Sequence, residues 1–192
     1  AEVDALYKLA EAGVRVPQPF GCFDGVLLME LVADDDGQPA PRLNDVVMSP
    51  AEAREDHALV MLYVMRMLCV GLVHGDLSEF NVLVDPYGPV IIDLPQAVDA
   101  AANNHAQWML SRDVQNMSNY YGQYAPELMD TEYDKEMWHL FEQGELHPDL
   151  ELTGQFIEER EDADVDSVLL EIKAAFEEER ARQERLRDAE GD

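Results

Sequence analysis

Three polar residues of this chain have the types and spacing that a phosphoryl-transfer site needs. Asp76 and Asn81 lie five positions apart in a polar loop, and Asp93 directly follows the apolar run at residues 90–92. Phosphoryl transfer from ATP uses one carboxylate to accept or orient the substrate hydroxyl, and oxygen ligands that hold Mg²⁺ against the phosphates. The spacing therefore indicates Asp76 as the proton acceptor, and Asn81 and Asp93 as metal ligands.

Two short β-branched runs would bring these residues together. Residues 82–84 and 90–92 are joined by a turn sequence at residues 85–88, which predicts a hairpin. Asn81 precedes the first run and Asp93 follows the second, so the hairpin would place them side by side. We interpret His74, at the start of the polar loop, as a structural residue that holds the loop backbone.

Helices and a second hairpin account for most of the remaining chain. Ser49, Pro50 and Glu52 form a capping box with a proline at the first helical position. They predict a helix that is apolar from residue 59 to 70 except at Arg66, and such a helix should be central and buried. Further helices are predicted at residues 2–12, 106–121, 130–141 and from about 164 to 187, and a hairpin at residues 20–32 with its turn at 24–25.

Composition narrows the class of protein. The 192 residues carry a net charge of −28, so the surface repels phosphate backbones and direct nucleic-acid binding is not expected. Such acidity is typical of a strongly solvated surface, or of a host with a salty cytoplasm. The longest apolar run, at residues 58–65, is too short for a membrane span. Cys22 and Cys69 are interpreted as buried thiols of a reducing compartment, and a cytoplasmic location is expected.

The polar loop also carries a family resemblance. Residues 74–81 resemble the catalytic loop of the RIO family of atypical protein kinases, whose pattern His-x-Asp-[Leu/Phe]-[Ser/Asn]-Glu-[Phe/Tyr]-Asn they match at every fixed position. Further motifs of that family are matched in the same order along the chain, at residues 11–19, 28–32, 40–43, 91–98 and 112–114. The resemblance runs from about residue 2 to about residue 121.

The resemblance implies an α+β, protein-kinase-like fold. Residues 1–32 would be a remnant of the small lobe and hinge, with one helix and a strand pair. Residues 33–150 would be the mainly helical large lobe, and residues 151–192 an acidic helical extension. No glycine-rich loop and no strand lysine precede Glu2. We therefore expect a fragment that lacks most of the small lobe and has little or no activity by itself.

The resemblance also implies roles for individual residues. Asp76 would be the catalytic aspartate, and Asn81 and Asp93 would bind Mg²⁺ or Mn²⁺ beside ATP. Asp93 would also be a candidate phosphoacceptor. Residues 28–32 would be the hinge, whose backbone at residues 30–32 would bind adenine while Met29 gates the pocket behind. Ser78 would steady a phosphate, and Glu2 would pair with the nucleotide-binding lysine. The residues implied to contact the nucleotide are thus Met29, Glu30, Leu31, Val32, Ser78 and Glu2.

These roles predict a serine protein kinase or ATPase that transfers the γ-phosphate to a protein serine or to its own aspartate. Two alternatives remain open. One is a small-molecule phosphotransferase of the aminoglycoside or choline kinase kind, which shares His-Gly-Asp and Ile-Asp elements. The other is a non-catalytic nucleotide-binding scaffold. The expected partners are ATP, a protein substrate of unknown identity and, by family analogy alone, a ribosome-associated protein.

Overall fold

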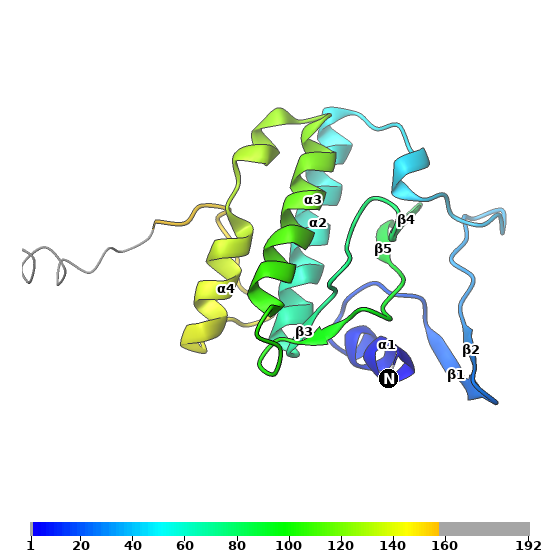
Figure 1. Cartoon of the computed structure of the whole chain (residues 1–192). Coiled ribbons are helices and arrows are strands. Elements are labelled where there is room, and N and C mark those ends of the chain that lie inside the picture. Colours follow the sequence, from blue (N-terminus) through cyan, green and yellow to red (C-terminus); the bar gives the residue numbers. More distant parts are fainter. Residues whose placement is uncertain (1, 158–192) are drawn as a thin grey trace, which may run out of the picture. The chain divides into compact units, whose positions relative to one another are not determined.

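The computed structural model describes residues 2–157, apart from the side chain of Glu2. Residues 2–156 make up one compact unit, shown in Figure 1. The helix predicted from about residue 164 to 187 lies outside the described residues. The elements in chain order are α1 (Glu2–Glu11), β1 (Pro19–Phe23), β2 (Val26–Met29), η1 (Leu43–Asp45), α2 (Pro50–Cys69), β3 (Leu72–Val73), β4 (Val82–Asp85), β5 (Gly88–Ile91), β6 (Val98–Asp99), α3 (Ala106–Gly122), η2 (Pro126–Asp130) and α4 (Tyr133–Gln143).

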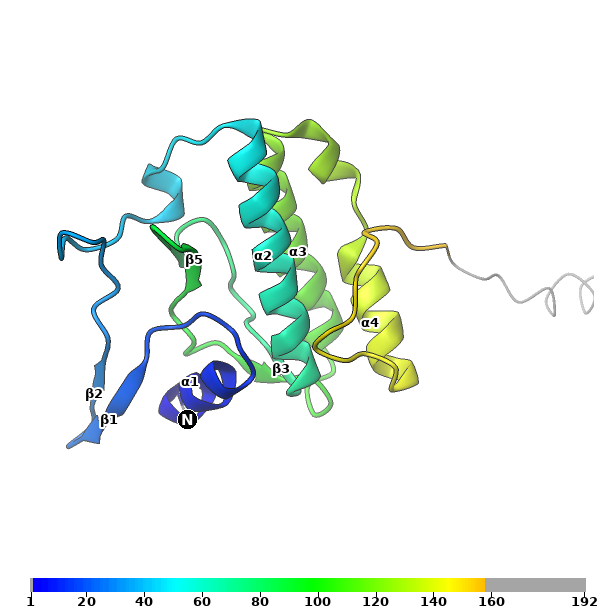
Figure 2. The same ribbon diagram turned by 180° about the vertical axis from the view of Figure 1, so that it is seen from behind.

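Helix α2 is the centre of the core, as its apolar sequence predicts. The capping box is present: the Glu52 N–H donates to Ser49 Oγ at 3.3 Å, and the Ser49 N–H donates to the Glu52 carboxylate at 2.7 Å. The helix packs against α3 and α4, and Figures 1 and 2 show α2 and α3 lying side by side. Val60 and Leu68 are completely buried there.

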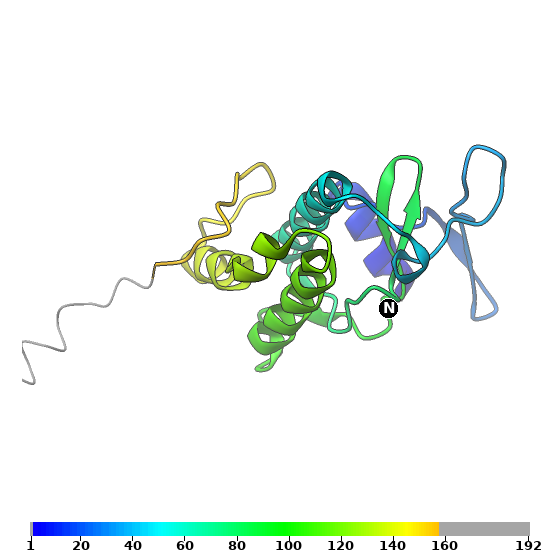
Figure 3. The same cartoon turned by 90° about the horizontal axis from the view of Figure 1, so that it is seen from above.

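Three antiparallel strand pairs accompany the helices in the described chain. The β4–β5 hairpin has the predicted turn, with Val82 opposite Ile91 and Asp85 opposite Gly88. The pair β3–β6 was not predicted, because two-residue strands are too short to show a period in the sequence. This pair brings together the two ends of residues 74–97, the segment that contains the polar loop and the β4–β5 hairpin. Figure 3 shows β4 and β5 between α1 and η1 in the view from above.

The β1–β2 hairpin turns at Asp24 and Gly25 as predicted, and both have a positive φ. Its side chains are largely exposed, including Phe23 at 64%. Cys22 lies on this hairpin and is exposed, so the prediction of a buried thiol is wrong for it, and Cys69 is half-buried. The reason is geometric, since an apolar strand sequence is buried only where another layer covers it.

Helix α1 is fixed to α2 at its C-terminal end. Gly13 has a φ of +75°, and the Arg66 guanidinium donates to its carbonyl at 2.8 Å. The left-handed backbone favours glycine here, and a Cβ at residue 13 would also displace Arg66 Nη1, which would lie 2.9 Å away. Leu6 and Leu9, the predicted apolar face of α1, are buried in the core.

Helix α4 starts at Tyr133, three residues later than predicted. Residues Pro126–Asp130 form the separate 3₁₀ segment η2, and Thr131 follows in an extended conformation. The acidic residues around position 130 resemble a helix start in the sequence, although the chain begins its helix only after this turn.

Buried His57 makes a pH-dependent contribution to stability. It is 2% exposed, its Nε2 lies 3.0 Å from Ser118 Oγ, and burial lowers its pKa to about 4. Above pH 6.5 the imidazole is neutral in both the folded and the unfolded chain. Between pH 6.5 and about 4 the unfolded chain binds a proton that the folded chain does not. The free energy of unfolding is therefore expected to decrease as the pH is lowered from 6.5 to about 4, by up to about 3 kcal/mol.

Urea unfolding of wild type and His57→Gln between pH 7.5 and 4.5 measures the contribution of His57 to the free energy of unfolding. Asp56 titrates in an overlapping range with the opposite sign, because burial raises its pKa to about 6. The difference between the two proteins therefore isolates His57. Exposed His147 supplies the control variant His147→Gln, which should keep the wild-type slope. The same pH slope in wild type and His57→Gln would contradict the assignment.

Candidate active site

The polar loop at residues 74–81 connects β3 to β4 and is held by one buried carboxylate. Asp113 of α3 is 1% exposed, and it accepts hydrogen bonds from the N–H groups of Gly75 at 2.7 Å and Leu77 at 2.9 Å. Burial raises the pKa of Asp113, while the two backbone donors oppose that rise. These bonds fix the backbone on both sides of Asp76.

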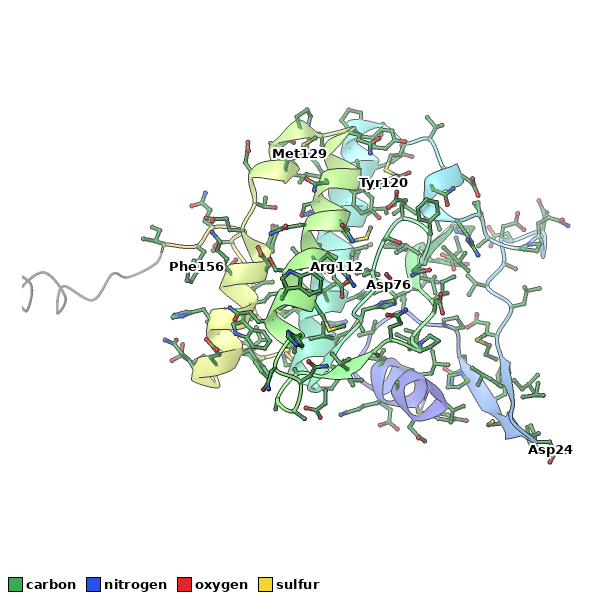
Figure 4. All side chains as sticks on the ribbon, viewed as in Figure 1. Asp24, Asp76, Arg112, Tyr120, Met129 and Phe156 are labelled. Carbon is green, nitrogen blue, oxygen red and sulfur yellow. The ribbon has the colours of Figure 1, made fainter. Side chains whose placement is uncertain are left out.

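Two further side chains of α3 hold the same loop. Arg112 donates to the carbonyl of Gly75, and its guanidinium lies 4.9 Å above the ring of Trp108. Asn116 Nδ2 donates to the carbonyl of Leu77 at 3.1 Å. Figure 4 shows Arg112 on the side of α3 that faces Asp76. One face of α3 thus satisfies N–H and C=O groups of the loop that neighbouring strands do not pair.

Gly75 cannot be replaced without moving this loop. Its φ is +82°, and a Cβ there would lie 2.8 Å from the carbonyl oxygen of Gln96. Both the left-handed backbone and the close approach therefore need glycine at this position.

His74 has the structural role that the sequence predicts. It is 3% exposed, and its Nε2 lies 3.0 Å from the carbonyl of Ile92, which is an acceptor. Its Nδ1 is 3.3 Å from the N–H of Asp76, which is a donor. A neutral ring with its proton on Nε2 satisfies both contacts. His74 thus joins the polar loop to the residue before Asp93.

Asn81 and Asp93 come together through the β4–β5 hairpin. The Ile92 N–H donates to the Asn81 carbonyl at 3.0 Å. Asn81 Nδ2 donates to the backbone carbonyl of Asp76 at 2.8 Å, which leaves its Oδ1 as the atom available to a cation. Asp93 is exposed and has a φ of +67°, a conformation that aspartate tolerates better than most residues. Asn81 thus bonds to Asp76 through its side chain and to Ile92, the residue before Asp93, through its backbone.

A cavity of about 460 Å³ lies next to this pair. It is lined by residues 29–32 of the hinge, by Asn81 and Asp93, and by the apolar side chains of Leu83 and Ile92. Six of the predicted site residues line it: Met29, Glu30, Leu31, Val32, Asn81 and Asp93. Asp76 and Ser78 are not among its lining residues.

The hinge backbone has open hydrogen-bonding groups at this cavity. The Glu30 N–H donates to the carbonyl of Gln18 at 2.9 Å, and the Val32 carbonyl accepts from Ala40 at 2.9 Å. Within the described part of the chain, the Glu30 carbonyl and the Val32 N–H have no hydrogen-bonding partner. One acceptor and one donor thus remain for the polar edge of a planar ligand.

The donor set fits Mg²⁺ held jointly with phosphate oxygens. Asn81 and Asp93 supply one amide oxygen and one carboxylate, which are hard ligands of the kind Mg²⁺ prefers. Residues 2–157 contain no cluster of three or more His, Cys, Asp or Glu side chains that could hold a metal without a further ligand. Glu2 begins α1, but its side chain is outside the described part, so its predicted lysine pairing stays a prediction.

Comparison with known families supplies the deciding observation. The family model of the RIO domain matches residues 1–134, a span that includes the polar loop, the hairpin and most of α3. The chain belongs to the RIO family. The RIO match establishes the protein-kinase-like fold, and the mixture of helices with short strand pairs agrees with the α+β class expected.

Curated relatives of this RIO chain come from archaea and eukaryotes. The RIO-type serine/threonine-protein kinase Rio1 of Haloferax volcanii is 43% identical over 117 residues, or 60% of this chain and 39% of that protein. The human serine/threonine-protein kinase RIO1 is 36% identical, over 67% of this chain and 22% of that protein. Rio1 of Thermoplasma acidophilum is 36% identical, over 70% of this chain and 67% of that protein. The chain thus matches less than half the length of the first two relatives.

Two residues that hold the RIO loop were not given a role from the sequence. The motif at residues 112–114 was noticed, yet nothing in it indicated that Asp113 and Arg112 bind the loop backbone 36 to 38 positions earlier. Among the described helices, none is both long and apolar enough to cross a bilayer.

Proposed function

We propose that this RIO domain binds ATP with Mg²⁺ or Mn²⁺ in the 460 Å³ cavity and belongs to a serine protein kinase or ATPase. The main support is that Asn81 and Asp93 line one cavity with the hinge, while the Asp76 loop is hydrogen-bonded to the Asn81 side chain and to the carbonyl of Ile92, the residue before Asp93. Adenine fits the apolar surfaces between Leu83 and Ile92 and the open hinge groups. The cation neutralises phosphate charge when bound.

Asp76 acts on the acceptor in this proposal. Its side chain is exposed and has no hydrogen bond or ion pair to any described residue, so it is free to accept the proton of a serine hydroxyl. Asp113, Arg112 and Asn116 hold the loop, and hence Asp76, at a fixed position. The protein thus contributes positioning and charge neutralisation, the main requirements of phosphoryl transfer.

A second acceptor is Asp93 itself. Its carboxylate is exposed and lines the same cavity, so an oxygen of Asp93 could attack the γ-phosphorus. The new P–O bond would form as the bond to the β-phosphate oxygen breaks and ADP leaves. An acyl phosphate is cleaved by hydroxylamine, whereas phosphoserine is not, so treating the phosphorylated protein separates the two acceptors.

Replacing Asp93 by asparagine tests the metal site. In the wild type, Mg²⁺ is expected to tighten ADP binding about tenfold or more, because the cation joins the phosphates to a carboxylate. In Asp93→Asn the Mg²⁺ effect should shrink to about twofold, because the neutral amide attracts the cation much less. Calorimetric titration of ADP with and without Mg²⁺ measures both values.

The matched control is Asp24→Asn at the tip of the β1–β2 hairpin, labelled in Figure 4. Asp24 is exposed, has a φ of 50° that asparagine also adopts, and lies outside the cavity. This variant loses the same charge and should bind as the wild type does. An unchanged Mg²⁺ effect in Asp93→Asn would argue against Asp93 as a ligand.

The two alternatives make different predictions. A small-molecule phosphotransferase would phosphorylate an aminoglycoside or choline in place of a protein. A non-catalytic scaffold would bind nucleotide with Asp76→Asn and wild type indistinguishable in every assay. A ribosome-associated partner is proposed by family analogy alone, and direct nucleic-acid binding is not expected at a net charge of −28.

A further inference from the structure

One arginine of the described chain stands apart from the others. Four of the five arginines in residues 2–157 have a partner fixed by the fold. These contacts are Arg15 with Asp85, Arg54 with Glu127, Arg66 with the carbonyl of Gly13, and Arg112 with the carbonyl of Gly75. The fifth is Arg42, whose guanidinium has no hydrogen bond or ion pair to any described residue. In a chain with 41 acidic and 13 basic residues, a guanidinium with neither a carboxylate nor a carbonyl partner among the described residues is notable.

Arg42 also lines the nucleotide-sized cavity. Among the described residues that bound the 460 Å³ space, Arg42 is the only lysine or arginine, and Asn81 and Asp93 lie in the same lining. The cavity has two carboxylates, those of Glu30 and Asp93. Glu30 accepts a hydrogen bond from the Gln18 N–H at 3.0 Å. Neither carboxylate is within ion-pair distance of Arg42.

The backbone around Arg42 is held firmly along the cavity. Arg42 forms a β-bridge with Leu83, which also lines the cavity, and the Val84 N–H donates to the Pro41 carbonyl at 2.9 Å. The next residue, Leu43, is completely buried, and the Tyr120 hydroxyl donates to its carbonyl at 2.7 Å. Figure 4 labels Tyr120 on α3 near the short helix η1. Arg42 is thus carried by a fixed segment, although its side chain is exposed.

We propose that the Arg42 guanidinium binds a phosphate oxygen of the nucleotide in this cavity. The inference rests on the proposed function and extends it by assigning a phosphate-binding cation that the hinge, metal and catalytic roles leave out. Guanidinium groups donate several hydrogen bonds in a plane that matches phosphate oxygens, and they stay charged at any working pH. Arg42 would then distinguish nucleotides by their phosphates, while the hinge recognises the base.

Comparing ADP with adenosine tests this assignment, because only ADP carries phosphates. We expect Arg42→Ala to weaken ADP binding about tenfold or more, as for loss of a charged hydrogen bond. Adenosine affinity should change less than about twofold, because the base contacts are untouched. Arg42→Lys should keep part of the ADP preference, since it retains the charge but not the planar donors. Calorimetry in Mg²⁺ at two salt concentrations measures these values, with a smaller salt dependence expected in Arg42→Ala.

The control is Arg54→Ala, which removes an exposed arginine that lies outside the cavity and pairs with Glu127. It should bind ADP as the wild type does, and circular dichroism should show the wild-type fold in every variant. Equal losses for ADP and adenosine in Arg42→Ala, or no loss for either, would overturn the assignment. If the wild type binds neither ligand, the proposed nucleotide site fails as well. If the wild type binds both and Arg42→Ala keeps its ADP preference, the role of Arg42 alone fails.

Discussion

Replacing Asp76 by asparagine is expected to lower the rate of phosphoryl transfer about 10²–10⁴-fold, the usual contribution of a positioned proton acceptor. The amide has nearly the shape of the carboxylate but cannot accept the hydroxyl proton. Nucleotide affinity should change less than about threefold, because the side chain of Asp76 does not line the cavity. Single-turnover transfer from γ-labelled ATP by the full-length protein carrying this domain measures the rate, and ADP calorimetry measures the affinity.

The stability of Asp76→Asn and a control variant together distinguish a loss of catalysis from a loss of folding in that experiment. The Asp76 carboxylate has no bond to any described residue, so Asp76→Asn should unfold at the same urea concentration as the wild type. Asp35→Asn is the matched control, since the Asp35 side chain is also exposed, has no hydrogen bond or ion pair to any described residue, and lies outside the cavity. A rate within threefold of wild type in Asp76→Asn would show that Asp76 is not the proton acceptor.

Replacing Asp113 by alanine is expected to destabilise the fold by about 4 kcal/mol, because it leaves two buried N–H groups without acceptors. Those groups belong to Gly75 and Leu77 on either side of Asp76. A loss of that size is a large part of the stability of a single domain. Urea unfolding measures the change, and hydrogen exchange should show faster exchange at the amides of residues 75 and 77.

Asp113→Asn keeps the experiment informative if the alanine variant does not fold. The asparagine amide has one acceptor oxygen and can satisfy only one of the two N–H groups, so a loss of about 2 kcal/mol is expected. Asp134→Asn is the control, because Asp134 is also buried but accepts from the Ser111 side chain. It should leave the exchange rates at residues 75 and 77 unchanged. Normal protection of those amides in both Asp113 variants would contradict the holding role.

Local features of the chain were readable because their physics is local. The capping box at Ser49 and Glu52 and the turn at residues 85–88 depend on neighbours within a few positions, and both are present. The apolar stretch after residue 59 likewise predicted the buried helix α2. Expectations that depended on what covers a segment were less reliable. Cys22 has the apolar neighbours of a buried residue, but no other layer covers its hairpin.

Contacts between distant segments left little trace in the sequence. Asp113 and Arg112 bind backbone groups, which every residue has. The residue types at positions 75 and 77 therefore do not indicate these contacts. Arg42 is a further case. The family motif that contains Arg42 was matched in the sequence. The β-bridge between Arg42 and Leu83 of β4 is what places Arg42 at the cavity, and no sequence pattern predicted that bridge.

The amino-acid sequence alone determined the residue types at 76, 81 and 93, the hairpin that joins the last two, and membership in a family of kinase-like proteins. Chemistry depends on side-chain type and short spacing, and both are written in the chain. Only the tertiary structure decided which side chains share the cavity, which face of α3 holds the loop, and which arginine has no partner among the described residues. Those outcomes arise from packing between segments tens of residues apart, where burial and backbone hydrogen bonding, rather than local propensity, select the arrangement.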